Sequence, residues 1–182
     1  MTTYIYVRAS RDEIAKIRDI NLYFPTPPDP SDVLNERVKV YIDTARRVYD
    51  YEPFEGSSEF VEMLSNYVVG VAIDPTTGTC NFDMAVLYSD RERGYLIRAG
   101  TRVYILEGRG YRVYPLIGEG CKIDRGAKVF YVLTGKREVR VVRSPRPGLV
   151  LIYSELIPCE IQVLRAVLVD ENDLVELERL RR

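Results

Sequence analysis

The stretch from Gly118 to Ile152 constrains the fold of this 182-residue chain more than any other. It contains three closely spaced glycines, two runs rich in Val, Tyr and Phe with a Thr134-Gly135-Lys136 turn between them, and Ser-Pro-Arg-Pro-Gly before the apolar run at Leu149. Glycine accepts the positive φ of tight corners, and proline is excluded from the central positions of a sheet. Because Val and aromatic residues favour strands, we predict three strands joined by tight turns.

This order of turns and strands resembles the biotinyl and lipoyl carrier domains. The segment Gly120-Cys-Lys-Ile-Asp-Arg-Gly126 matches the Gly-Asp-x-Val-x-x-Gly turn of that family. The segment Ser144-Pro-Arg-Pro-Gly-Leu-Val150 is similar to its Ala-Pro-x-x-Gly-x-Val motif. The resemblance implies a barrel-sandwich hybrid, in which two flattened sheets wrap a small core and a hairpin carries the modified lysine.

Lys136 takes the place of that lysine in the resemblance, and it is the residue that a lysine-modified carrier would use. Its neighbours Gly135 and Arg137 differ from the methionines, or the Asp-Lys-Ala context, that flank a carrier lysine. The chain also fails to repeat the glycine turn after Ile152. We therefore expect the fold without its cofactor, with Lys136 as a solvated turn residue.

The wider stretch from about residue 68 to 152 is similar to a family of archaeal proteins of unknown function built on such a hybrid domain. This resemblance rests on VGVAIDPTTG, GYLIRAGTRVYILEGRGYRVYPLIGEG and VLTGKREVRVVRSPRPG, and it implies a fold and an archaeal source but no activity. The absence of histidine and the single glutamine resemble the composition of a thermophile.

Charge is segregated along the chain, although the net charge is only −1. Residues 1–90 contain 8 Lys and Arg against 15 Asp and Glu, whereas residues 91–150 contain 14 against 5. We predict an α+β, mainly β protein: an acidic N-terminal α/β portion over 1–90, a basic barrel-sandwich hybrid domain over 91–169 and a C-terminal helix over 170–182. Leu174, Leu177 and Leu180 would share one side of that helix.

Three further patterns predict local structure. Ser10 and Glu13 form a capping box that opens a short helix. Ser58–Asn66 has helical spacing, and Tyr67–Asp74 with Thr79–Tyr88 reads as a hairpin. Around Glu107-Gly-Arg-Gly110, two similar segments predict a second hairpin that closes at the glycines.

No catalytic or metal site is indicated. Without histidine the chain has no Ser-His-Asp triad, no Cys-His pair and no His-containing metal site. Glu107, Glu119 and Asp124 stand beside turn glycines, where carboxylates are ordinarily solvated. Asp74 and Asp83 could bind a cation between them. The Asp-Pro turn that Asp74 opens is, however, sufficient to explain an aspartate at that position. We interpret the three widely spaced cysteines as small buried apolar residues, and a disulfide between two of them stays an alternative. They are Cys80, Cys121 and Cys159.

We therefore expect a cytoplasmic protein with no membrane span, which acts as a non-enzymatic interaction or scaffold module on a protein partner and is open to homo-oligomer formation. The alternative is an RNA-binding or ribosome-associated protein, because Arg with interleaved Tyr can contact phosphates and unpaired bases. That alternative uses the basic hairpin, with Arg137, Arg140, Arg143 and Arg146 as candidate nucleic-acid contacts. A lysine-modified carrier is the third reading.

Overall fold

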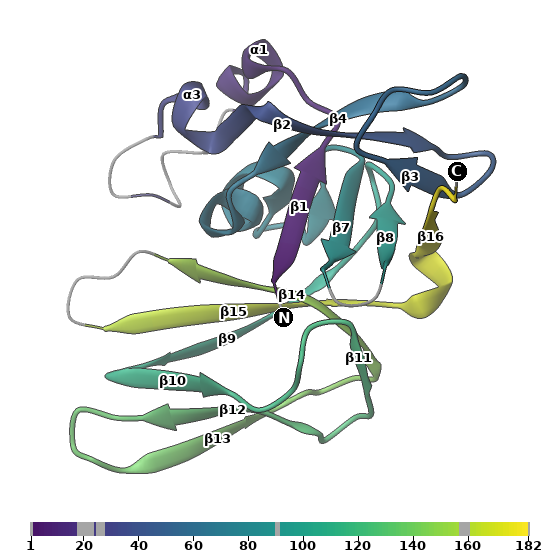
Figure 1. The fold of residues 1–182 in the computed structure, drawn as a ribbon. Helices are drawn as coiled ribbons and strands as arrows, with labels where there is room; N and C mark the ends of the chain where they lie inside the picture. The colour runs from purple at the N-terminus through teal and green to yellow at the C-terminus, as the bar shows by residue number, and fades with distance from the viewer. Residues whose placement is uncertain (1, 18–23, 25–27, 90–91, 157–160, 182) are drawn as a thin grey trace. The chain divides into compact units, whose positions relative to one another are not determined.

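The computed structural model describes residues 2–17, 24, 28–89, 92–156 and 161–181 of the chain (Figure 1). The fold is mainly β and divides into two units. The barrel unit comprises Met1–Arg102 and Leu174–Arg182, and the second unit comprises Val103–Asp173. Among the helices of the residues that the structure describes, none is long and apolar enough to cross a membrane.

Seven strands of the barrel unit close into a barrel in the order β1-β4-β2-β3-β16-β8-β7. All neighbours in it are antiparallel except β16 and β3, which are parallel. The strands are β1 (Thr3–Val7), β2 (Leu34–Asp43), β3 (Val48–Asp50), β4 (Ser58–Met63), β7 (Met84–Tyr88), β8 (Arg93–Ile97) and β16 (Val175–Arg179).

The inside of the barrel is filled by apolar and aromatic side chains from all seven strands, as closure of a small barrel requires. They include Tyr6 of β1, Phe60 of β4 and Leu177 of β16, each no more than 1% exposed. Side chains along each strand point alternately into this core and away from it. The strand β16 therefore contributes one fully buried residue, Leu177.

The predicted C-terminal helix is wrong. Residues Glu171–Asp173 form a single 3-10 turn, and the chain then continues as β16 between β3 and β8 (Figure 1). Backbone pairing with two strands satisfies the groups that a helix would bond internally, and the N–H of Leu180 also donates to the carbonyl of Tyr49 over 2.8 Å. The leucine spacing alone does not distinguish a helix from a strand. The segment forms a strand because it pairs with both β3 and β8 and so completes the barrel.

The predicted helix at Ser58–Asn66 is also wrong, because this segment forms β4 between β1 and β2. Phe60 and Met63 are buried as expected, but Leu64 is exposed. The predicted capping box is confirmed at helix α1 (Arg11–Ala15), where Ser10 and Glu13 bond each other's backbone N–H. A second short helix, α3 (Pro30–Val33), is capped by Asp29.

The hairpin predicted around residues 67–88 is much shorter than expected. Its turn is present, and the N–H of Gly78 donates to the carbonyl of Asp74 over 2.8 Å. Only β5 (Ile73–Asp74) and β6 (Thr79–Cys80) pair across it. A 3-10 turn (Ser65–Tyr67) and an irregular helical segment (Val68–Ala72) precede it. The segment is irregular because Gly70 has a φ of 114°, which excludes a continuous strand there.

The second unit consists of two sheets around their own core. One sheet has the order β10-β12-β13 and the other the order β11-β14-β15-β9. Phe130, Val150 and Ala166 are among the side chains fully buried between them. The strands are β9 (Tyr104–Gly110), β10 (Arg112–Pro115), β11 (Cys121–Ile123), β12 (Lys128–Leu133), β13 (Val139–Arg143), β14 (Gly148–Leu156) and β15 (Gln162–Val169).

The strands predicted in the stretch from Gly118 to Ile152 are confirmed as β12, β13 and β14. Gly120 and Gly126 have φ values of 73° and 87°, as tight corners require. The Gly120 N–H donates to the carbonyl of Val150 in β14, and the Gly126 N–H donates to the carbonyl of Ser144, the residue directly after β13.

The hairpin predicted at Gly108 and Gly110 is wrong, because β9 pairs with β15 and β10 pairs with β12. The glycines instead allow the chain to pass from one sheet to the other. A Cβ on Gly110 would lie 2.5 Å from Val132 Cγ1 and 2.7 Å from a backbone oxygen. The second unit begins at Val103, whereas the predicted domain begins at residue 91, and the described residues 92–102 lie in the barrel unit.

Candidate functional site

The sheet β10-β12-β13 turns alternate side chains toward the core and away from it. Val113 of β10 is paired with Val132 of β12, and Phe130 of β12 with Val142 of β13. All four belong to the core of the second unit or pack against it. Because side chains alternate along a strand, the residues between these positions point outward.

The outward positions form two cross-strand rows, which we call the outer face. Tyr114, Tyr131 and Val141 make one row, with 53%, 37% and 41% of their surfaces exposed. Arg112, Leu133 and Val139 make the next row, and Val139 is 65% exposed. A soluble surface strand usually carries polar residues outward. The outer face therefore has two neighbouring tyrosine rings and exposed valines where charged residues are expected.

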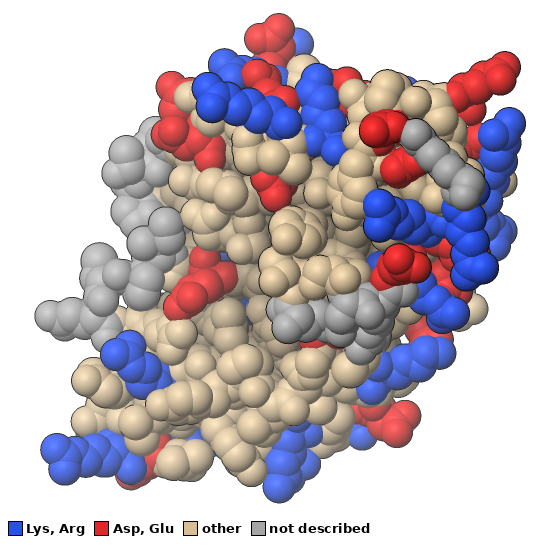
Figure 2. All heavy atoms as spheres, viewed as in Figure 1, with Lys and Arg blue, Asp and Glu red and all other residues tan. Residues whose placement is uncertain are grey.

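Cations surround the outer face. Arg112 lies in its second row, and Lys128 is paired with Arg143 beyond the tyrosine row. All three are exposed, and none forms an ion pair within the described ranges, whereas Arg140 pairs with Glu138 over 3.5 Å. In Figure 2 the region where β10, β12 and β13 lie in Figure 1 is mostly tan, with blue and fewer red side chains along its margin.

The four arginines predicted as nucleic-acid contacts do not form one row. Arg140 is paired with the core residue Val132, so it leaves the strand on the side opposite Arg143. Arg143 donates from Nη1 to the carbonyl of Gly126 over 2.9 Å. Arg137 is in the hairpin turn with a φ of 63°, and Arg146 lies beyond the other end of β13 with its guanidinium 5.9 Å from the ring centroid of Tyr104.

Lys136 lies at the tip of the β12–β13 hairpin, where the sequence predicted it, and it is exposed. The tip is closed by two backbone hydrogen bonds, from Thr134 N–H to Glu138 and from Arg137 N–H to Thr134, each 2.9 Å long. These bonds hold the lysine on a defined turn. Whether it is modified stays a prediction.

A hollow of about 780 Å³ lies at the same end of the second unit. Arg112 belongs both to this hollow and to the outer face, and its guanidinium lies 5.3 Å from the ring centroid of the exposed Tyr111. The hollow is lined by Arg109, Gly110, Tyr111, Arg112, Thr134, Gly135 and Ile161.

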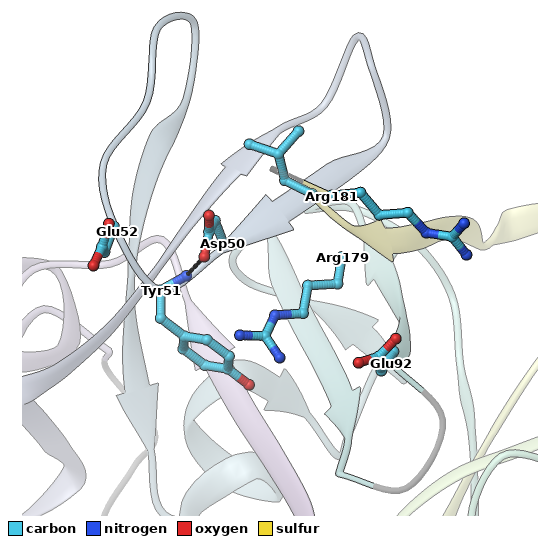
Figure 3. A pocket seen from close by; sticks show the side chains of 7 residues that line it. Asp50, Tyr51, Glu52, Glu92, Arg179 and Arg181 are labelled. Carbon is cyan, nitrogen blue, oxygen red and sulfur yellow. Dashed lines mark hydrogen bonds between the residues drawn. The ribbon is translucent and has the colours of Figure 1, made fainter.

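The barrel unit has a second hollow of about 630 Å³ where β3 meets β16 (Figure 3). The guanidinium of Arg179 lies 5.5 Å from the ring centroid of Tyr51, while Arg181 points away from that ring. Asp50 accepts a hydrogen bond from the Tyr51 N–H over 2.7 Å. Glu52 and Glu92 also line this hollow, so it mixes both charges and favours neither sign of ligand.

Of the five carboxylates considered as chemical groups, four have structural partners, and Asp124 is exposed. Asp74 accepts from the Thr76 N–H over 2.8 Å, and Asp83 from the Ala99 N–H over 2.9 Å. Glu107 pairs with Arg165 over 3.0 Å, and Glu119 accepts from the Tyr153 N–H over 2.7 Å. The described residues contain no cluster of three or more metal-ligating side chains.

The cysteines that the structure describes are free. Cys80 is buried, and this burial raises the pKa of its thiol to about 12, so the thiolate that would react is suppressed. Cys121 is partly buried. Cys159 lies outside the described residues.

Sequence reasoning missed Tyr114 and Tyr131 as surface residues. The sequence places Tyr131 between Phe130 and Val132 in a predicted strand, but it does not show which side of that strand faces the core. The available signal was the alternation Val113-Tyr114 and Tyr131-Val132, which would have identified the outward side if the pairing of β10 with β12 had been known.

Two comparisons place the chain among known proteins. The family model described as "Uncharacterized protein conserved in archaea (DUF2118)" matches residues 5–158, which include strands of both units. The "Uncharacterized protein MJ0859" of Methanocaldococcus jannaschii is 28% identical over 134 residues, which cover 67% of this chain and 77% of that protein. The match to the family model spans most of the chain, and the chain therefore belongs to this archaeal family.

Proposed function

We propose that the second unit is a barrel-sandwich hybrid of the biotinyl/lipoyl type that serves as a cofactor-free interaction module. Its two sheets, its glycine corners at Gly120 and Gly126, and its hairpin support the fold assignment. The residues beside Lys136 differ from those that flank a carrier lysine, which supports an unmodified lysine.

One observation carries the proposal: the outer face exposes a tyrosine pair and two valines in ordered cross-strand rows. Contiguous apolar surface of this kind marks interaction sites in soluble proteins. Tyrosine is favoured at such sites because its ring gives apolar contact while its hydroxyl stays compatible with water. The partner would therefore bind the outer face and not the lysine.

The experiment is the intact mass of the protein isolated from an archaeal host, followed by the mass of the peptide that contains Lys136. We expect the unmodified 21.0 kDa chain. The Lys136→Arg variant, prepared in the same way, shows which peptide would carry a modification. A biotinyl or lipoyl increment on Lys136 in the natural sequence, absent from the variant, would contradict the proposal and favour a carrier domain.

RNA binding or ribosome association is the second candidate function, and one specific observation favours it. Between Arg109 and Arg146 the chain has ten Lys and Arg against three Asp and Glu. Such an excess attracts phosphate over a range of about a Debye length. Binding to total RNA that weakens as salt rises would support this candidate, and binding that is absent at low salt would remove it.

A further inference from the structure

We infer that the outer face is a stacking platform for single-stranded RNA. This inference rests on the proposed function, since it names the partner of the same interaction module. It requires three features to coincide on one face: flat aromatic rings that are open to a base, cations at the spacing of phosphates, and no carboxylates competing for those cations.

The rings are the first feature. Tyr114 and Tyr131 are direct cross-strand partners, so their Cβ atoms are about 5 Å apart and both side chains leave the sheet on the same face. Both are substantially exposed. Aromatic residues on the face of a β-sheet stack two or three unpaired bases in RNA-binding modules. A pair of tyrosines gives room for about two bases.

The cations are the second feature, and one pair of them is informative. Lys128 and Arg143 are direct cross-strand partners, and like charges in this position destabilise a sheet. A bound phosphate would turn this repulsion into attraction, because each cation would then face an anion. Arg143 already donates to the Gly126 carbonyl over 2.9 Å, which orients its side chain.

The geometry along the strands agrees with a short nucleic-acid chain. Arg112 lies two residues from Tyr114, about 7 Å along β10, and Arg143 lies two residues from Val141 on the other side of the tyrosine row. Cations therefore stand on both sides of the rings. At the Arg112 end, the hollow with Arg109 and Tyr111 continues the basic and aromatic surface.

The absence of competing carboxylates is the third feature. In the barrel unit, several cations have acidic partners, as in Arg11 with Glu36 and Lys39 with Glu59. Within the described ranges no carboxylate pairs with Arg112, Lys128 or Arg143, and Glu138 instead pairs with Arg140 on the other side of β13. The unpaired cations therefore favour a negatively charged partner over a neutral one. A polyanion such as RNA also carries its phosphates at regular intervals, which an acidic protein surface does not.

The test is a titration of the full chain into a fluorescein-labelled 12-nucleotide oligouridylate, followed by anisotropy at 50 mM and 200 mM salt. Neutralisation of three phosphates predicts a slope of about −2 in log affinity against log salt. Tyr131→Ala should weaken binding about tenfold or more, because one stacked base is lost, whereas Tyr131→Phe keeps the ring and should keep the affinity. Tyr114→Ala provides the same test at a more exposed position.

Two arginines on one strand provide the matched charge control. Arg143→Gln and Arg140→Gln change the net charge equally, but only Arg143 lies on the outer face. We expect Arg143→Gln to weaken binding severalfold more than Arg140→Gln. Equal effects would mean diffuse attraction and would overturn the platform.

Three other results would overturn it: no binding at 50 mM salt, unchanged affinity in both tyrosine-to-alanine variants, or equal affinity for a duplex whose bases are not free to stack. Thermal unfolding of each variant verifies that the fold is kept. These failures would leave the interaction module intact, whereas a modified Lys136 would contradict the module without changing the titration.

Discussion

Leu177 closes the core of the barrel, and its replacement by alanine tests how the C-terminal segment is folded. Leu177 is fully buried beside core residues of the barrel such as Phe60 and Leu96. Truncation of a buried leucine costs about 2–5 kcal/mol, a large part of the roughly 5–15 kcal/mol that stabilises an ordinary domain. At the middle of these two ranges, the barrel of Leu177→Ala should lose about a third of its stability.

Leu174→Ala is the matched control, since a helix over 170–182 would place Leu174 on the same side as Leu177. In the strand arrangement Leu174 is only partly buried, so its truncation should cost about 1 kcal/mol or less. Urea unfolding followed by tyrosine fluorescence measures both variants, because the chain has 14 tyrosines and no tryptophan. Equal losses of stability in the two variants would refute the strand assignment of β16.

Three further outcomes follow from the packing. Gly110→Ala should destabilise the second unit by about 1–3 kcal/mol, because its new Cβ would lie 2.5 Å from Val132 Cγ1; unchanged thermal unfolding would contradict this close approach. Cys80 should react with a thiol reagent at pH 8 only after unfolding, while the less buried Cys121 reacts earlier; peptide mapping of the labelled protein distinguishes the two, and early labelling of Cys80 would argue against its burial. Burial raises the pKa of Tyr49 to about 12, so its contribution to stability is complete below an unfolded pKa near 10 and is lost as pH rises toward 12. The urea midpoint should therefore fall between pH 9 and 12, and it should fall less in Tyr49→Phe.

Local turn chemistry made the stretch from Gly118 to Ile152 predictable. Gly120 and Gly126 adopt the positive φ values that only glycine accepts readily, and the prolines at 145 and 147 separate β13 from β14. These signals act within a few residues, so the sequence is sufficient to place the strands and the hairpin that carries Lys136.

The C-terminal strand could not be predicted in the same way. Its partners β3 and β8 lie more than 75 residues earlier in the chain. A leucine at every third position is typical of a helix face, and nothing in the local sequence indicates that Leu177 alone points into a barrel. The helix predicted over β4 failed for a related reason: β4 is paired on both sides, and those tertiary contacts override local spacing.

The candidate site was predicted only in part. The sequence identified a basic hairpin, and alternation along a strand already places Arg140 and Arg143 on opposite faces. It could not show that Arg143 shares its face with the tyrosines, or that Arg140 pairs with Glu138. The outer face also depends on β10 joining β12, and the glycines of β9 suggested a different pairing. Strand pairing is therefore the information that sequence reasoning lacked.

The central claim is that the outer face of the second unit binds the partner. Its most direct test is affinity purification of the natural sequence and of the Tyr114→Ala/Tyr131→Ala variant from an archaeal host at low salt, each with and without nuclease. The account predicts that RNA is recovered with the natural sequence, is removed by nuclease, and is at least tenfold depleted with the variant. Equal recovery of RNA with both proteins would contradict a binding site on the outer face.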